Sequence, residues 1–235
     1  MTSRERKGRP AAGEVKGVVV DIDGTLSDST RRVGLEAIAA LRRVNDSGVV
    51  TMLASGNVLP IAYSLATYCG LDGPIIAENG GIVCNKQKIW VLADPEQPRR
   101  AYEHLRANMT AERLFTDRWR ETEIGIRQDT GLDDVRRILE DFEVDVQSTG
   151  WAIHIMERGM DKMVGVRKAC EILGLSPDDV AAIGDSENDE RMLTGCGWGV
   201  AVGNAPDETK GVATYAAAKE SGDGVVEALG WLRLL

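Results

Sequence analysis

The sequence has 235 residues, a net charge of −9 and a 43% share of hydrophobic residues. This length suits one large domain or two smaller ones, and the apolar share is enough for a buried core. The acidic balance argues against nucleic acid and against an anionic membrane surface as partners. It still permits a phosphorylated substrate, because a binding site can be locally positive on an acidic protein.

Cysteine and histidine usage offers no zinc-type cluster. The four cysteines are far apart and form no CxxC pair, and the chain has two histidines. Buried free thiols in a reducing cytoplasm are the simplest explanation. The cysteines are Cys69, Cys84, Cys170 and Cys196.

The N-terminal segment 1–14 is basic, but no apolar stretch follows it, so we do not expect a signal peptide. We predict that residues 1–14 form a flexible tail. No apolar run approaches the length of a membrane span, and we expect a cytoplasmic protein.

The first eighty residues alternate between predicted strands and helices. The β-branched run at 18–20 indicates a buried strand, and the apolar spacing over 34–47 is typical of a helix. A strand over 49–54, a helix beginning near Val58 and a strand over 75–77 follow. This order predicts right-handed crossovers and a parallel sheet with helices on its faces.

Residues 82–157 change character, and we predict a separate, smaller α+β unit there. Its strands alternate in the way that half-exposed antiparallel strands do, and Gly150 suits a hairpin turn. The expected elements are a hairpin over 82–92, helices over 96–109 and 132–142, and strands over 121–128, 144–148 and 151–156.

From residue 162 to the end of the chain, predicted helices and strands alternate again. The expected elements are a helix over 162–173, strands over 180–183 and 199–202, and a helix over 223–234. The predicted fold class is therefore α/β, with a Rossmann-like parallel sheet. Its core is expected from residues 15–81 and 158–235, with 82–157 inserted as an α+β cap.

Three of the buried strands end in small, polar or acidic residues. In an open parallel sheet, ligands bind beyond the carboxyl ends of the strands, so the three segments should meet at one crevice. Asp21 and Asp23 alone allow two interpretations: solvated acids in an Asp-Gly turn, or a hard-metal site with one carboxylate free for chemistry. The segments are Asp21-Ile22-Asp23-Gly24-Thr25, Ser55-Gly56-Asn57 and Gly184-Asp185-Ser186-Glu187-Asn188-Asp189.

Together with Lys162, these segments resemble the four signature motifs of the haloacid dehalogenase (HAD) superfamily of phosphatases. The resemblance covers about residues 17–230, and 82–157 stands where the superfamily carries its larger cap. Within the superfamily, the chain is most similar to archaeal-type phosphoglycolate phosphatases. The stretches that support this are Ala54-Ser55-Gly56-Asn57-Val58, Glu78-Asn79-Gly80-Gly81, 116–121 and 154–162.

The resemblance implies Mg²⁺-dependent hydrolysis of 2-phosphoglycolate to glycolate and phosphate through an aspartyl-phosphate. Asp21 is the implied nucleophile, Asp23 the general acid and base, and Lys162 the positive charge beside them. The implied metal ligands are Asp21, Asp23, Asp185 and Asp189, with Asn188 supporting them. The implied substrate-binding residues are Thr25, Ser55, Gly56, Asn57 and Lys162 for the phosphoryl group and Arg118 for the carboxylate.

Several functional alternatives stay open. Asp23 favours phosphoryl transfer over dehalogenation, whose enzymes lack this second acid, but it does not separate a phosphatase from a mutase. The rival functions are a phosphatase for sugar phosphates or other small esters, and a non-enzymatic phosphate-binding domain. The expected partner is a small phosphorylated metabolite, and the chain is expected to be a monomer or a homodimer.

Other features have competing interpretations. Gly195–Gly199 looks like a dinucleotide loop but precedes its strand, which favours a turn. Trp119 fits a strand edge as well as a substrate-binding surface, and His154 fits a structural histidine better than a catalyst. Asn204 and Asp207 are expected near the rim of the crevice, without an assigned role.

Overall fold

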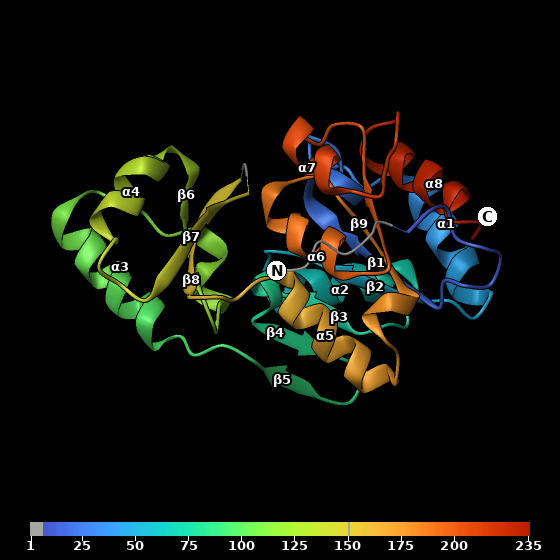
Figure 1. Cartoon of the computed structure of the whole chain (residues 1–235). Coiled ribbons are helices and arrows are strands. Elements are labelled where there is room, and N and C mark those ends of the chain that lie inside the picture. The colour runs from blue at the N-terminus through green and yellow to red at the C-terminus, as the bar shows by residue number, and fades with distance from the viewer. Residues whose placement is uncertain (1–6, 150) are drawn as a thin grey trace.

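The computed structural model describes residues 7–149 and 151–235. Within them the chain forms an eight-stranded sheet and a three-stranded sheet, which lie side by side (Figure 1). We call the eight-stranded sheet with its helices the large unit. The three-stranded sheet with helices α3 and α4 is the small unit.

Strand β1 (Gly17–Asp21) lies inside the sheet of the large unit and is buried along its whole length. It pairs in parallel with β2 on one side and with β9 on the other, so the carboxyl ends of these three strands are neighbours. The order is β11-β10-β9-β1-β2-β3-β4-β5. The other strands are β2 (Val50–Ala54), β3 (Ile75–Ala77), β4 (Ile82–Cys84), β5 (Ile89–Val91), β9 (Val180–Gly184), β10 (Trp198–Ala201) and β11 (Tyr215–Ala216).

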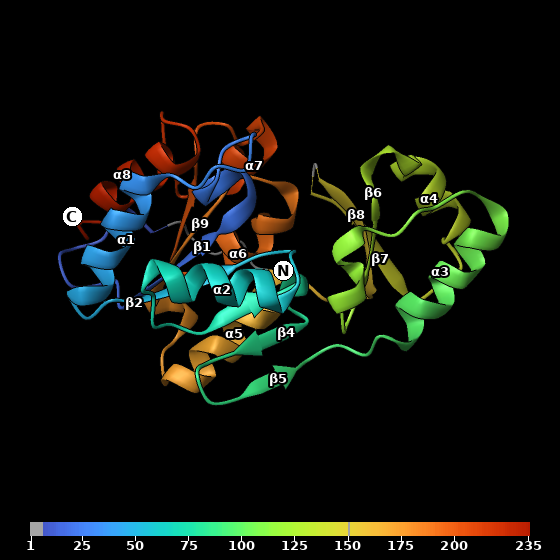
Figure 2. The same cartoon turned by 180° about the vertical axis from the view of Figure 1, so that it is seen from behind.

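Helices cover both faces of this sheet because β1 is apolar on both sides. Val18 and Val20 belong to the core cluster shared with α1, α2 and α8, whereas Val19 belongs to the cluster shared with α5 and α6. Helix α5 lies on the near face in Figure 1, and α2 lies on the near face in Figure 2. The helices are α1 (Leu35–Asp46), α2 (Leu59–Cys69), α5 (Lys162–Leu173), α6 (Glu190–Gly195), α7 (Asp207–Val212) and α8 (Ser221–Trp231).

The small unit is an antiparallel sheet of order β6-β8-β7 packed against α3 and α4. Leu105 of α3 and Val135 of α4 share its core with Ile126 and Ile153 of the sheet. The unit therefore has a hydrophobic core of its own. Its elements are α3 (Glu96–Asn108), β6 (Ile124–Arg127), α4 (Leu132–Ile138), β7 (Val144–Ser148) and β8 (Ala152–Glu157).

The hairpin predicted over 82–92 forms, but its assignment to the small unit is wrong. Strand β4 pairs antiparallel with β3, and β5 pairs with β4, so both extend the large sheet. The physical reason is a reversal of the chain at Glu78–Gly80, directly after β3, which brings β4 back along the open edge of its neighbour. Helices α6 and α7 and the short strand β11 were not predicted. The turn predicted at Thr149–Gly150 lies partly outside the described residues.

Residues 7–14 are docked on the large unit, so the prediction of a flexible tail is wrong for them; residues 1–6 lie outside the described part of the chain. Arg9 donates to the carbonyls of Trp231 (2.7 Å) and Gly230 (3.0 Å). The indole of Trp198 donates to the carbonyl of Gly8 at 3.2 Å. Carbonyls in the last turn of a helix lack intrahelical partners, and Arg9 provides donors for those at the end of α8.

We expect Arg9→Ala to lower the melting temperature by about 2–4 °C. The reason is the loss of hydrogen bonds worth about 1 kcal/mol in a chain of this size. Thermal unfolding of Arg9→Ala, with the exposed Arg99→Ala on α3 as control, measures this. Equal melting temperatures for the two variants would contradict the docking role.

No helix among the described residues is both long and apolar enough to cross a membrane. The four cysteines are buried thiols that form no disulfide with one another, as predicted.

Candidate active site

Asp21 lies at the carboxyl end of β1, and Lys162 is the first residue of α5. The Lys162 ammonium donates to Asp21 Oδ1 at 2.5 Å and to Asp189 Oδ1 at 2.7 Å, and all three side chains are buried. Burial raises the pKa of Asp21 well above its ordinary range, against the effect of Lys162. Burial alone would lower the pKa of Lys162, but Asp189 and Asp21 raise it above its ordinary value. The lysine therefore stays charged and offsets part of the repulsion between the carboxylates.

The loop after β9 brings two more carboxylates to the same place. Asp189 Oδ2 accepts from the backbone amides of Asp185 (3.0 Å) and Ser186 (3.1 Å), which fixes its orientation. Asp185 Oδ1 accepts from the Thr25 hydroxyl at 2.7 Å. Burial, followed by the nearby charge of Asp189, raises the pKa of Asp185 to about 6.

Gly24 makes this approach of two loops possible. Its φ is +91°, a conformation that side chains rarely adopt, and a Cβ there would collide with the Asp185 carboxylate. The turn after β1 can therefore lie against the loop after β9 only with glycine at this position.

The carboxylates of Asp21, Asp185 and Asp189 fit a divalent cation. One oxygen from each lies within 4.8 Å of the others. Asp21 Oδ2 is buried and has no hydrogen-bond partner among the described residues, which is costly for a carboxylate oxygen unless a cation binds it. An all-oxygen donor set of this kind suits a hard cation.

We expect a divalent cation to raise the melting temperature much more at pH 7.5 than at pH 5. The folded-state pKa of Asp185 is about 6, above the unfolded value near 3.9, so the metal-free fold loses stability as pH rises between these values. A cation that binds the ionised carboxylates reverses this loss only where they are ionised. At about a hundredfold excess over its dissociation constant, the rise should be about 5–10 °C.

Thermal unfolding with and without a chelator, at the two pH values, measures this effect. Asp185→Asn should abolish the response to the cation, and Asp46→Asn, an exposed aspartate at the end of α1, should retain it. An equal response of the wild-type protein at both pH values would contradict the assignment.

Asp23 faces a second group of side chains at the same end of the sheet. Its Oδ2 accepts from Asn57 Nδ2 at 2.6 Å and from the Ser55 hydroxyl at 3.5 Å. Its Oδ1 accepts from Arg31 Nη2 at 3.2 Å. The first two strand-end motifs are therefore in direct contact, as the sequence predicts for neighbouring parallel strands.

A cavity of about 500 Å³ opens over these residues and is lined by both units. Asp21, Asp23 and Lys162 line it from the large unit, and Phe115 and Trp151 from the small unit. The small unit thus covers the crevice at the carboxyl ends of the strands, where ligands of open α/β sheets bind.

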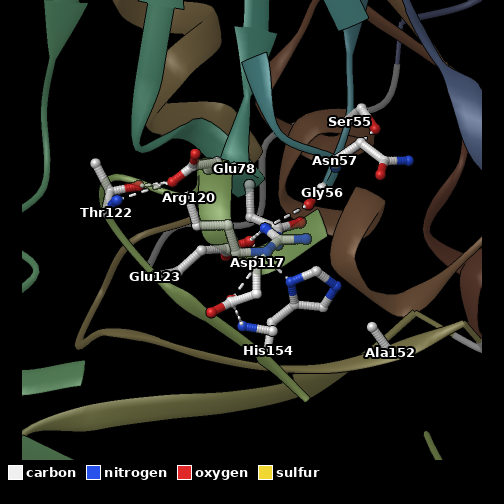
Figure 3. Close-up of polar contacts among 12 residues, drawn as sticks. Ser55, Gly56, Asn57, Glu78, Asp117, Arg120, Thr122, Glu123, Ala152 and His154 are labelled. Atoms are coloured by element: carbon white, nitrogen blue, oxygen red, sulfur yellow. Dashed lines mark hydrogen bonds and ion pairs between the residues drawn. The ribbon is translucent and has the colours of Figure 1, made fainter. Parts of the chain in front are cut away.

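A buried polar contact, which we call the clasp, joins the two units (Figure 3). Glu78, directly after β3, accepts hydrogen bonds from the Thr122 amide (2.8 Å), the Thr122 hydroxyl (2.7 Å) and the Glu121 amide (3.1 Å). Glu78 and Asn79 both have left-handed backbone, with φ of 49° and 50°. Such strain persists only where the surrounding contacts hold it.

Next to the clasp, Glu123 connects the two units through a chain of hydrogen bonds. Its carboxylate contacts Arg120 and His154 Nδ1 (2.8 Å) and accepts from Asn79 at 3.0 Å. Asn79 in turn accepts from Asn188 at 3.1 Å. Asn188, predicted to support the metal ligands, therefore also links the loop after β9 to the small unit.

The structure does not bring every predicted residue to the cavity in the expected way. Arg118 lies over the rings of Phe115 and Trp119 and is absent from the described cavity lining; Arg120, two residues later, does line it. The Thr25 hydroxyl contacts Asp185 and holds this carboxylate in place. His154 lines the cavity but is engaged by Glu123.

The remaining predicted features take ordinary structural positions. Gly195–Gly199 runs from the end of α6 into β10, so the turn interpretation is correct. Asn204 donates to Asp185 Oδ2 at 3.3 Å and lies beside the site, and Asp207 begins α7. Arg31, which contacts Asp23, was not predicted near the site; its local sequence signal is a polar turn that begins at Asp28.

Comparisons with known proteins agree with this geometry. Residues 18–123 and 126–229 match the sequence family of haloacid dehalogenase-like hydrolases. A protein of Methanothermobacter thermautotrophicus named phosphoglycolate phosphatase is 37% identical over 221 residues, which are 92% of this chain and 100% of the relative. One of the same name from Methanopyrus kandleri is 38% identical over 215 residues, covering 88% of this chain and 93% of the relative.

Comparison with solved structures also identifies proteins of similar fold. The crystal structure of a Thermoplasma acidophilum protein superposes with a TM-score of 0.88 at 29% identity and covers 94% of this chain and 99% of that one. A haloacid dehalogenase-like hydrolase from Bacteroides thetaiotaomicron superposes with a TM-score of 0.77 at 25% identity, covering 94% and 100%. With the two aspartates at the carboxyl end of β1, the lysine at the start of α5 and the acidic loop after β9, these matches show that the chain belongs to the haloacid dehalogenase-like hydrolases.

Proposed function

We propose that this protein is a Mg²⁺-dependent phosphatase that hydrolyses 2-phosphoglycolate to glycolate and phosphate. The observation that carries the proposal is the placement of Asp21 and Asp23 at the floor of a covered cavity, with Lys162 paired to Asp21. The relatives named phosphoglycolate phosphatase, which align over about nine tenths of this chain, support the choice of substrate.

In the proposed reaction, Asp21 is the nucleophile and Asp23 transfers the protons. A carboxylate oxygen of Asp21 attacks phosphorus as the bond to the glycolate oxygen breaks, and Asp23 donates its proton to that oxygen. Asp23 then takes a proton from water, whose oxygen attacks phosphorus. The bond between Asp21 and phosphorus breaks, which releases phosphate and restores the carboxylate.

Other side chains hold the phosphoryl group and the two aspartates in place. Asn57 orients Asp23 through its 2.6 Å hydrogen bond, and Lys162 offsets negative charge beside Asp21. In this proposal, Ser55 and the backbone at Gly56 bind the phosphoryl oxygens.

Asp21, Asp185 and Asp189, with the backbone carbonyl of Asp23, are the groups that would hold Mg²⁺. When bound, the cation supplies positive charge that offsets the charge of the phosphoryl oxygens. Hard oxygen donors and few protein ligands favour Mg²⁺ over softer metals.

We further propose that the small unit acts as the cap of the active site. In this division, residues 15–81 and 158–235 form most of the catalytic core, and the β4–β5 hairpin belongs to the core rather than to the cap. The cavity lining by Phe115 and Trp151 supports a covering role that excludes water and selects the substrate.

A phosphatase for sugar phosphates is the second candidate function. The observation that favours it is the cavity of about 500 Å³, which is larger than a two-carbon phosphate ester fills. The two candidate functions differ in the leaving group: glycolate carries a negatively charged carboxylate, whereas a sugar is neutral.

Phosphate release from a panel of substrates tests both candidates. The purified protein is assayed with 2-phosphoglycolate, hexose and pentose phosphates and p-nitrophenyl phosphate, each with Mg²⁺ and with a chelator. The proposal expects the highest kcat/KM for 2-phosphoglycolate and no turnover without the cation. Higher kcat/KM for a sugar phosphate would favour the second candidate, and no release from any ester would exclude a phosphatase.

A further inference from the structure

Arg31 lies on a short turn that the fold holds in one conformation. A β-bridge between Ser27 and Val33 closes the turn, and Asp28 Oδ1 accepts from the Thr30 amide (2.7 Å) and the Arg32 amide (3.0 Å). Arg31 itself has left-handed backbone with φ of 66°, which is uncommon for a residue with a long side chain. This conformation places Arg31 in the lining of the cavity.

Three permanently cationic side chains line the cavity in the described residues, and two of them are already paired. Lys162 donates to Asp21 and Asp189. The side chain of Arg120 is 1% exposed and lies between the carboxylates of Asp117 and Glu123. Arg31 has a 53% exposed side chain and contacts a carboxylate through one nitrogen, Nη2, at 3.2 Å from Asp23 Oδ1. The guanidinium of Arg31 therefore has donors to offer to a ligand.

The contact with Asp23 sets where such a ligand would be. In the proposed reaction Asp23 donates its proton to the leaving oxygen, so that oxygen lies beside the Asp23 carboxylate. In 2-phosphoglycolate one carbon separates this oxygen from the substrate carboxylate. The carboxylate is therefore close enough to Asp23 to reach a guanidinium that contacts Asp23, as that of Arg31 does.

The indole of Trp151 covers one face of the guanidinium. The Arg31 Cζ atom lies 4.9 Å from the ring centroid, a cation–π distance. Stacking on a ring orients the plane of the guanidinium and leaves its N–H edge available for a carboxylate. Trp151 belongs to the small unit, so the contact forms only where the small unit covers the cavity.

We propose that Arg31 binds the carboxylate of the substrate and thereby makes the enzyme selective for phosphorylated acids. The inference rests on the proposed function, because it uses Asp23 as the proton donor to the leaving oxygen. In this proposal Arg31, a residue of the large unit, takes the role in carboxylate recognition that was predicted for Arg118.

The test compares two substrates that differ in this one charge. Wild type, Arg31→Gln and Arg31→Lys are assayed with 2-phosphoglycolate and with its neutral amide, and kcat/KM is determined for each. Arg31→Gln should lower the preference for the acid over the amide on the order of tenfold to a hundredfold, the range of a charge-assisted hydrogen bond. Arg31→Lys should retain part of the preference, and Arg32→Gln, on the same turn, should retain all of it.

The outcomes separate this inference from the proposed function. If Arg31→Gln loses activity equally on acid and amide, Arg31 acts through Asp23 alone and the inference is wrong. If wild type prefers the acid and Arg31→Gln keeps that preference, the inference fails and the proposed function stands. If wild type hydrolyses p-nitrophenyl phosphate but not 2-phosphoglycolate, the proposed function itself fails.

Discussion

Replacing Asp21 with asparagine is expected to lower kcat by about 10⁴-fold or more, because the amide cannot attack phosphorus as a carboxylate does. The protein should stay folded. Burial raises the pKa of Asp21, which means that the fold disfavours its ionised form, and the neutral amide removes that cost. We therefore expect the metal-free variant to melt no lower than wild type at neutral pH.

Phosphate release and thermal unfolding, measured on the same preparation, test both parts of this prediction. Asp46→Asn makes the same chemical change at an exposed position of α1 and should leave kcat unchanged. A folded Asp21→Asn protein with near-wild-type turnover would show that another residue is the nucleophile.

Replacing Lys162 with methionine should affect both stability and catalysis. Removal of one partner from a buried ion pair typically costs about 3–5 kcal/mol, because it leaves buried charge without compensation. Here Asp21 and Asp189 would face each other without the ammonium between them. The loss of positive charge beside the reacting group should lower kcat by about 10²–10³-fold.

Urea unfolding gives the change in the free energy of unfolding, and steady-state kinetics give kcat. Lys168→Met is the matched control, since Lys168 lies on the same helix and pairs with the exposed Glu171 at 2.9 Å. Both quantities should stay close to wild type in the control. A Lys162→Met protein as stable as Lys168→Met would contradict the role of the ion pair.

The strand-end motifs could be predicted because they depend on local patterns. An apolar run followed by Asp21-Ile22-Asp23-Gly24 defines a buried strand and a turn within a few residues, and parallel pairing then places it beside Ser55. The family resemblance added the partner lysine. These contacts need no knowledge of how the small unit sits on the large one.

The contacts between the units could not be predicted, because they join residues that are far apart in sequence. Glu78 contacts Thr122 across 44 positions, and nothing local to either residue indicates the other. The position of Arg118 relative to the cavity could not be predicted for a similar reason. The helical turn Phe115–Trp119 keeps Arg118 on its aromatic side chains, and Arg120, just past the turn, lies against Gly56 of the large unit.

The clasp at Glu78 would also determine which part of the small unit moves furthest if the two units separate. A buried contact of this kind acts as a pivot, and displacement grows with distance from it. Ala152 pairs with Arg127, the last residue of β6, which is five residues along the chain from Thr122. In an opening about the clasp, the neighbouring Trp151 would therefore move further than Glu123. Such an opening would separate Trp151 from Arg31 before it breaks the contacts at Glu78, so the stacking that orients the guanidinium would be lost first.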